Sequence, residues 1–518
     1  MSSRRAVKEN PLIVILRSAR GLLREIITYN MGRVGLVILA FMIVMSIYSL
    51  TTLPGDFPSK WRYATEPPWI YNPKMAKPEW VRYLGIDVSK TSIYSNLRPQ
   101  DSRIILIPED IGRIAPEYVK AMGIKKLLPF GYVEVYRVNY NLDVNDYAQD
   151  VLVIFEVKAS ENVNLSRIKM NVLMLLTRPD GLVLEVGEES FPLDKIRLVK
   201  IDHGAFSLQY IDYFNLTITL EEMKSAYYIA VFGEPRAGGR EFARLPGEYQ
   251  VTLILAYTGI DPREIAKMFG EGSLRVNVEI RVLGNSYGLL GTDNVGRDLF
   301  QGVLFGFPVA LAIGFLVALA TVMIGLVLGV ISGYFGGRVD EVIQRLVDVI
   351  VNVPLLPLLI LVGVAIQTRG WAGWPAMAIL MFIIVVFSWG GVAIVTRSMA
   401  LSIKSEQYVE AAKAIGASTS RIVFRHIIPQ LIPYTMAVLV FSVPGAIIAE
   451  AGLSVLGIDH GLPTWGRILA DAQANRGIAY NMWWWILPPG LLLGFFSFAF
   501  VALGFTLETI VEPRLRRR

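Results

Sequence analysis

The sequence contains no cysteine and only three histidines, His203, His426 and His460. A chain without thiols forms no disulfide, no iron–sulfur cluster and no thiol nucleophile. The histidines lie far apart and match no metal-ligand spacing, so we predict no metal site. The chain also lacks the G-x-x-x-x-G-K-[ST] phosphate loop and any evident nucleophile–base arrangement, so we predict no nucleotide site, no cofactor and no catalytic residue.

Charged residues are scarce as well. They make up 18% of the 518 residues, whereas a typical soluble domain has about 25%. The deficit is concentrated in long stretches without any ionisable side chain, and 53% of the chain is hydrophobic. The net charge of +6 comes largely from lysine and arginine beside these stretches. We therefore predict a membrane protein whose basic residues set its orientation, with membrane lipid as a partner and no nucleic acid.

Six apolar stretches are long enough to cross a bilayer. The first, residues 34–55, follows a basic segment at residues 1–33 and exceeds the roughly 7–15 residues of a signal-peptide core, so we expect an uncleaved helix. At 1.5 Å per residue, each stretch can span a hydrocarbon core of about 30 Å. We predict an α-helical, multi-pass protein of the cell membrane with six transmembrane helices. The other five stretches are 299–337, 349–368, 370–396, 427–449 and 477–507.

The connections between the stretches sort by charge. Arginines and lysines follow the second stretch at Arg338 and Arg345, the fourth at residues 397–425, and the last at residues 514–518. All fall on the side of the basic start, which predicts that both termini are cytoplasmic. The opposite connections are poorer in positive charge and contain tryptophans suited to the membrane interface: Trp371, Trp374, Trp465 and Trp483.

Residues 56–288 are far too long for a connector, and this topology places them outside the cell. From about residue 129 they contain short runs rich in β-branched and aromatic residues, with a turn sequence at residues 178–181. We predict a β-rich, sandwich-like domain without long helices. Asn164 and Asn215 begin N-glycosylation sequences. The predicted strands are 132–138, 151–157, 169–177, 182–186, 215–220, 227–231, 249–257 and 275–283.

The segment between the fourth and fifth stretches predicts helix, turn, helix. Alanine-rich sequence favours the first helix, Gly416 suits its left-handed C-terminal cap, and Ser418 can cap the second. Small residues on the first helix leave a thin profile that can enter a narrow groove. Considered alone, the alanine-rich helix is more readily interpreted as an ordinary amphipathic surface helix.

Taken whole, the segment resembles the EAA loop of ABC importer permeases. Glu410-Ala411-Ala412 is followed after three residues by Gly416-Ala417, and then by the tetrad His426-Ile427-Ile428-Pro429. Residues 290–298 resemble the GTDxxGRD segment of the same family, and residues 333–340 and 449–457 agree with it. The resemblance covers residues 289–515 and the first apolar stretch, and is to the DppC/OppC-like permeases of oligopeptide and dipeptide importers.

This resemblance implies a type I importer permease fold. The core would be residues 289–515, with five transmembrane helices and a coupling loop at 397–429, followed by a basic tail at 516–518. It also implies a non-catalytic subunit with three kinds of partner: a second homologous permease, two ATP-binding cassette ATPases that bind ATP and magnesium, and an extracytoplasmic substrate-binding protein. The implied ATPase-coupling residues are Glu410, Ala411, Ala412, Gly416, Ala417, Arg421, Arg425 and Pro429.

Other roles remain open at this point. Glu450, near the outer end of the fifth stretch, would line the translocation path or gate, or cap a helix at the interface. The outside domain would dock the binding protein, shield the complex or bind solute itself. Peptides are the expected cargo, with oligosaccharides and then nickel as alternatives. A channel or receptor with an outside sensor is the alternative from a different class.

Overall fold

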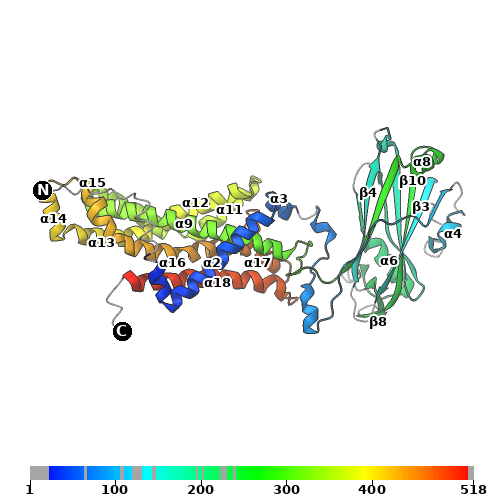
Figure 1. Cartoon of the computed structure of the whole chain (residues 1–518), viewed down its shortest axis with the longest axis horizontal. Coiled ribbons are helices and arrows are strands. Elements are labelled where there is room, and N and C mark those ends of the chain that lie inside the picture. The colour runs from blue at the N-terminus through cyan, green and yellow to red at the C-terminus, as the bar shows by residue number, and fades with distance from the viewer. Residues whose placement is uncertain are drawn as a thin grey trace, which may run out of the picture. The chain divides into compact units, whose positions relative to one another are not determined.

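A computed structural model of the chain describes residues 21–511 apart from 22, 64–66, 106–109, 119–130, 143–147, 161, 194–196, 201–202, 221–222, 224–229 and 237–240. Most of the predicted basic segment 1–33 and the whole tail 516–518 lie outside the described residues. The chain forms two compact units, one made of Met1–Glu66 with Leu299–Arg518 and the other of Pro67–Asp298. The first is helical and the second is rich in strands (Figure 1).

The helical unit contains long apolar helices joined by shorter ones. In the described part of the chain, five helical segments are long and apolar enough to cross a membrane: Asn30–Thr52, Leu299–Phe335, Trp374–Lys404, Thr419–Val455 and Trp483–Ile510. A sixth span exists if the pair Gly337–Asn352 and Leu355–Thr368, which is bent by 76°, is counted as one. The elements are α2 (Asn30–Thr52), α3 (Phe57–Arg62), α9 (Leu299–Phe335), α10 (Gly337–Asn352), α11 (Leu355–Thr368), α12 (Trp374–Ser388), α13 (Gly390–Lys404), α14 (Gln407–Ala414), α15 (Thr419–Ile422), α16 (Ile428–Val455), α17 (Trp465–Ala474) and α18 (Trp483–Val511).

The bend between α10 and α11 lies within the stretch 349–368, where we expected one continuous helix. Val353 has extended backbone, with φ −75° and ψ 122°, and Pro354 follows it. Proline disfavours helical backbone in the residue before it and supplies no N–H donor, so the helix ends there and α11 begins in a new direction.

Helices α9 and α13 pack with their backbones in close contact (Figure 1). Gly325, Gly329 and Gly333 recur every four residues on α9 and therefore share one face. A Cβ atom on these glycines would lie 2.9, 2.6 and 2.6 Å from carbonyl oxygens of α13, those of Trp389, Ala393 and Arg397 respectively. Small residues at this spacing let membrane helices approach closely. The Thr396 hydroxyl reinforces the contact by donating to the Gly325 carbonyl at 3.0 Å.

The second unit is a β-sandwich of two antiparallel sheets, with an additional two-stranded ribbon. The four-stranded sheet has the order β1 (Ser92–Tyr94), β11 (Leu274–Gly284), β4 (Ala148–Ala159) and β7 (Arg197–Lys200). The five-stranded sheet has the order β2 (Asp101–Ile105), β3 (Gly131–Leu142), β10 (Gly247–Thr258), β5 (Lys169–Thr177) and β6 (Val183–Pro192). The ribbon pairs β8 (Gly233–Arg236) with β9 (Glu241–Arg244).

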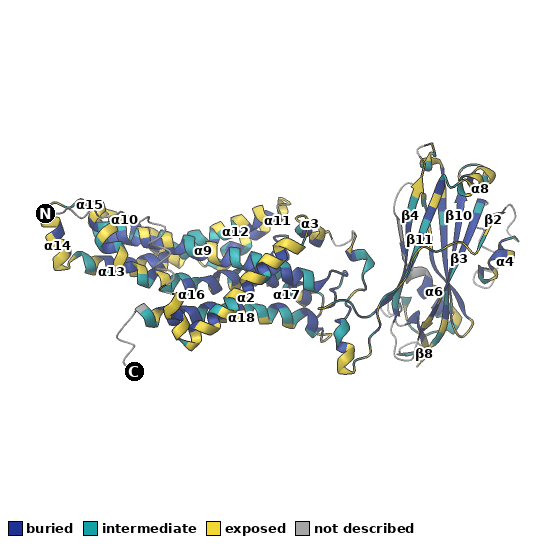
Figure 2. Cartoon of the chain, in the orientation of Figure 1, coloured by how far each residue is buried: buried dark blue, intermediate teal, exposed yellow. Residues whose placement is uncertain are grey.

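Alternating residues of both sheets form one core. Phe155 of β4, Ile280 of β11 and Leu253 of β10 belong to it, and it is the dark blue interior of Figure 2. On its other face, β3 buries Val133 and Val135 against a second cluster that includes the short helix α4 (Ile111–Ile114). The β-branched and aromatic residues by which the sequence predicted these strands occupy these buried positions.

One predicted strand is wrong, a second lies mostly outside the described residues, and the predicted turn is confirmed. Residues 215–220 follow a helix that we did not predict, α6 (His203–Phe214), whose Phe206 and Tyr210 are fully buried. Of residues 227–231, the described Ala230 and Val231 are not in a strand. β-branched residues favour strands only where a half-buried sheet position exists for them. The turn at residues 178–181 joins β5 to β6, with Gly181 at φ 80°.

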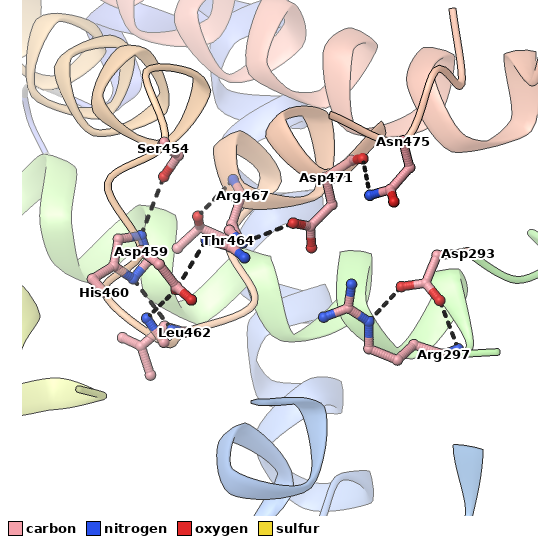
Figure 3. A network of polar contacts seen from close by, with 12 residues as sticks. Asp293, Arg297, Ser454, Asp459, His460, Leu462, Thr464, Arg467, Asp471 and Asn475 are labelled. Carbon is pink, nitrogen blue, oxygen red and sulfur yellow. Dashed lines mark hydrogen bonds and ion pairs between the residues drawn. The ribbon is translucent and has the colours of Figure 1, made fainter. Parts of the chain in front are cut away.

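The segments that enter and leave the sandwich are hydrogen-bonded to each other. Met75 N donates to Asp293 O at 2.7 Å, Thr292 N to Ala76 O at 3.0 Å, and Lys77 N to Asn285 O at 2.9 Å. The buried Asp293 carboxylate pairs with the Arg297 guanidinium in the returning segment (Figure 3). The two ends of this unit therefore form one stem.

The close packing of α9 on α13 predicts opposite effects for two glycine substitutions. Gly329→Ala should destabilise the chain by about 1–3 kcal/mol, because its Cβ would meet the Ala393 carbonyl at 2.6 Å. Gly391→Ala on α13 is the control, since its Cβ would have no atom within 4 Å, and it should be neutral or stabilising. Thermal unfolding of the detergent-purified chain measures both. Equal melting temperatures for the two variants would contradict the packing.

The sandwich should also lose stability as pH rises. Burial raises the pKa of Glu134, whose Oε2 accepts hydrogen bonds from Tyr257 at 3.0 Å and Tyr136 at 3.1 Å. Above about pH 4.5, its ordinary value, the unfolded chain releases this proton while the folded chain keeps it, so the free energy of unfolding falls until pH passes the raised pKa. Calorimetry across this range should show a weaker decline for Glu134→Gln. The exposed Glu248→Gln on β10 is the control, and an unchanged profile for both variants would contradict the assignment.

Candidate functional site

The first candidate site is the turn between α14 and α15 at one end of the helical unit. Gly416 has φ 84°, in the left-handed region, and ends α14 as the sequence predicted. The Ser418 hydroxyl caps α15 by accepting from Arg421 N at 3.4 Å. A π-helical turn, Val423–Ile427 (η7), then leads into α16. This local sequence therefore fixes a compact helical corner that projects from the ends of longer helices.

Apolar side chains attach this corner to the spanning helices. Val409 of α14, Ile422 of α15 and Ile427 are buried. They share one cluster, whose other members are Leu326 and Val330 of α9, Ala400 of α13 and Leu431 of α16. Several helices contribute to this apolar cluster. Side-chain packing, and not only the two chain connections, therefore attaches the corner firmly to the spanning helices.

The residues exposed on the surface of the corner are not all those that the sequence predicted. Ala412 is only 9% exposed, so its side chain belongs to the anchored face, whereas Ala411 and Ala414 are exposed. Ile415 is 87% exposed and Phe424 71% exposed, and sequence reasoning missed both. Ile415 is the C-cap residue of α14 and lies directly before the left-handed Gly416, so it belongs to the turn and not to the buried face of the helix. Of the other predicted coupling residues, Ala417 is half-buried; the exposed ones are Glu410, Gly416, Arg421, Arg425 and Pro429.

An ion pair lies at the same end of the helices. Arg397 of α13 donates through Nε and Nη2 to the two carboxylate oxygens of Asp340 on α10, at 2.5 and 2.6 Å. The hydroxyl of Ser332 on α9 donates to the same carboxylate, and Gln344 donates to that hydroxyl at 3.1 Å. A two-point arginine–carboxylate contact is more directional than a single bond. It ties α10 to the α9–α13 pair beside the corner.

The second candidate site surrounds Glu450 of α16. Its Oε1 accepts three hydrogen bonds, from the Thr464 hydroxyl at 2.7 Å, His460 Nε2 at 2.9 Å and the Ser454 hydroxyl at 3.0 Å. All four side chains are buried. His460, Ser454 and Thr464 were not predicted, because nothing in their spacing indicates that the chain folds back onto α16.

The tautomer of His460 follows from its contacts. Its Nδ1 accepts from Leu462 N at 3.2 Å (Figure 3), so the proton lies on Nε2, which donates to Glu450. The Thr464 hydroxyl both donates to Glu450 and accepts from Arg467 N at 3.1 Å, which caps α17. Glu450 therefore fixes the loop that follows α16 and the start of α17.

The same loop contacts the connection between α11 and α12. Gly373 N donates to the His460 carbonyl at 2.7 Å, and a Cβ on Gly461 would meet the Ala372 side chain at 2.9 Å. Where Glu450 and His460 meet Ile313, Met377 and Leu380, no space for a water molecule remains. In this conformation the cluster is closed, and the predicted path or gate role of Glu450 stays a prediction.

The two predicted glycosylation residues lie in the sandwich unit. Asn164 and Asn215 are both exposed. Asn164 Oδ1 accepts from the Ser166 hydroxyl of its own triplet at 2.6 Å. Their modification also stays a prediction.

Known proteins resemble the helical unit. Residues 325–517 match the family described as binding-protein-dependent transport system inner membrane component. The dipeptide transport system permease protein DppC of Bacillus subtilis (strain 168) is 32% identical over 229 residues, which are 44% of this chain and 69% of DppC. The oligopeptide transport system permease protein OppC of the same organism is 31% identical over 229 residues, which are 44% of this chain and 72% of OppC.

A third relative is named for a different cargo. The glutathione transport system permease protein GsiD of Pectobacterium atrosepticum is 33% identical over 229 residues, covering 44% of this chain and 73% of GsiD. The family match contains the α14–α15 corner and Glu450, and all three relatives are permease proteins. The chain is therefore a multi-pass, non-catalytic membrane component that belongs to the binding-protein-dependent inner-membrane transport family, among the DppC/OppC-like permeases of ABC peptide importers.

Proposed function

We propose that the chain is one of two pore-forming subunits of an ATP-driven peptide importer and that its α14–α15 corner docks on an ATPase. The anchored corner with its exposed Ile415 is the observation that carries this proposal. Its partners are a second homologous permease, two ATP-binding cassette ATPases that hold ATP and magnesium, and a substrate-binding protein outside. The ATPases supply the energy, since the sequence has no phosphate loop.

The packing supports a mechanical role for the corner. The apolar cluster joins α14 and α15 to α9, α13 and α16, so a force applied at Ile415 is transmitted to the spanning helices. Closure of the ATPases on ATP would move the corner and tilt these helices between inward-facing and outward-facing states, as in rigid-body switching. Exposed Arg421 and Arg425 would pair with acidic groups of the ATPase.

The orientation and cargo are part of the same proposal. With the bent α10–α11 pair counted as one span there are six, an even number that puts both termini on one side, and we assign that side to the cytoplasm. The β-sandwich would then lie outside, where it would dock the substrate-binding protein. The relatives' names, which specify dipeptides, oligopeptides and glutathione, support peptides over oligosaccharides or nickel as cargo.

Crosslinking tests the docking surface directly, because the chain has no cysteine of its own. Ala414→Cys places one thiol on the exposed face of α14, and Ala412→Cys is the control with its side chain only 9% exposed. In membranes that contain the assembled importer, we expect a short bismaleimide to join Ala414→Cys to single-cysteine ATPase variants and to leave Ala412→Cys uncrosslinked. Absence of any ATPase adduct with Ala414→Cys would reject the docking surface, and would move a channel or receptor function to first place.

Two substitutions separate the possible roles of Glu450. Glu450→Ala leaves three buried donors without their acceptor, and each loss costs about 1–3 kcal/mol, so we expect a lower melting temperature. Glu450→Gln keeps an acceptor oxygen and should retain stability and peptide uptake in proteoliposomes that contain the complete importer. Normal stability together with lost uptake in Glu450→Gln would instead place the carboxylate in the translocation path.

A further inference from the structure

The outer face of the four-stranded sheet carries a cleft of about 260 Å³. Its floor is formed by β4 and β11, and its rim by Tyr71 of a short 3-10 helix and by Ser95 and Asn96 after β1. Asn96 has φ 54°, which turns the chain at the rim. The cleft lies wholly within the sandwich unit, and neither candidate site described above includes it.

One end of the cleft contains the guanidinium of Arg281, which is paired with the carboxylate of Glu279. Tyr71 and Glu279 hold Arg281: its guanidinium carbon lies 5.1 Å from the Tyr71 ring centroid, and its Nε donates to Glu279 Oε1 at 2.6 Å. Its two terminal nitrogens make no hydrogen bond to any residue that the structure describes. A guanidinium held in this way presents a planar pair of donors, the geometry that binds a carboxylate at two points.

The other end contains the carboxylate of Glu156. Glu156 Oε2 accepts from Asn277 Nδ2 at 3.0 Å and from Lys158 Nζ at 3.2 Å, and these hydrogen bonds lower the pKa of Glu156. The carboxylate is therefore anionic near neutral pH, and its side chain is 45% exposed. It can accept hydrogen bonds from an ammonium group in the cleft.

The register of the strands sets the distance between the two charges. Glu156 lies opposite Asn277, and Arg281 follows Asn277 by four residues on the same face of β11. Four residues of strand span roughly 13 Å. The Arg281 side chain is directed toward Glu279, which lies between Asn277 and Arg281 on β11. The distance between the guanidinium and the Glu156 carboxylate is therefore shorter than the span of the strand. An extended peptide of two or three residues is roughly 7–11 Å long and would bridge it.

We propose that this cleft binds a free peptide of two or three residues, with its carboxylate on Arg281 and its ammonium group on Glu156. The volume lies below the roughly 300 Å³ at which pockets for drug-sized ligands begin, which disfavours longer oligomers. An oligosaccharide fits less well, because the Tyr71 ring on which a sugar would stack is covered by the guanidinium. The proposal goes beyond the importer function, since peptide can bind here whether or not the α14–α15 corner docks on an ATPase.

Calorimetric titration of the full detergent-purified chain with tri-L-alanine tests the cleft. We expect saturable binding at one site, and loss of that binding when the peptide is N-acetylated or C-amidated, because each change removes one of the two charges. These ligand comparisons require no variant of the protein. Absence of saturable tri-alanine binding would overturn the proposal, as would equal binding of the blocked peptides or binding of maltotriose in place of the peptide.

Three variants locate the binding. Arg281→Gln and Glu156→Gln should each weaken tri-alanine binding by about tenfold or more, the effect of losing one charged hydrogen-bond partner. Lys267→Gln is the control, because this exposed lysine pairs with Glu271 at 3.7 Å on α8 (Pro262–Gly270) and does not line the cleft. Circular dichroism verifies the fold of each variant. Unchanged affinity in Arg281→Gln would overturn the assignment.

Discussion

The helical unit depends on the absence of side chains along one face of α9. Gly325, Gly329 and Gly333 let the backbone of α9 lie against α13, and a Cβ at any of them would meet a carbonyl oxygen of α13 within 3 Å. The apolar cluster below the α14–α15 corner and the Asp340–Arg397 pair both draw residues from this helix pair or its neighbours. Each of these contacts presupposes the close approach, because the side chains involved reach one another only when the two helices lie side by side.

Two kinds of interaction hold the ends of the spanning helices. At the corner the contacts are apolar, through the buried side chains of Val409, Ile422 and Ile427. Around Glu450 the contacts are hydrogen bonds to one carboxylate oxygen, which are directional and costly to break when buried. The proposed docking surface is therefore held by apolar packing shared among several helices, whereas the loop after α16 is held by directional hydrogen bonds.

The sequence predicted features whose cause is local. Uncharged stretches indicated apolar spans, Gly416 and Ser418 predicted the corner, and the Arg178–Gly181 turn was found because proline, aspartate and glycine act on neighbouring backbone. Features that depend on distant partners were missed or wrong. The exposure of Ile415, at the C-cap of α14, depends on how the corner is anchored to other helices. The contact of Glu450 with Thr464 joins residues fourteen apart, and residues 215–220 lacked a sheet position to occupy.

The stem of the β-sandwich has a consequence for how such a chain arises. The entering segment around Ala76 and the returning segment around Thr292 are hydrogen-bonded to each other, so the unit begins and ends at nearly the same point in space. A domain with adjacent ends can be inserted into a short loop, or lost from it, without stretching the flanking chain. The sandwich can therefore evolve as a separate inserted domain. Its cleft and surface loops can diversify from one lineage to another while the membrane-spanning helices remain under a separate selection.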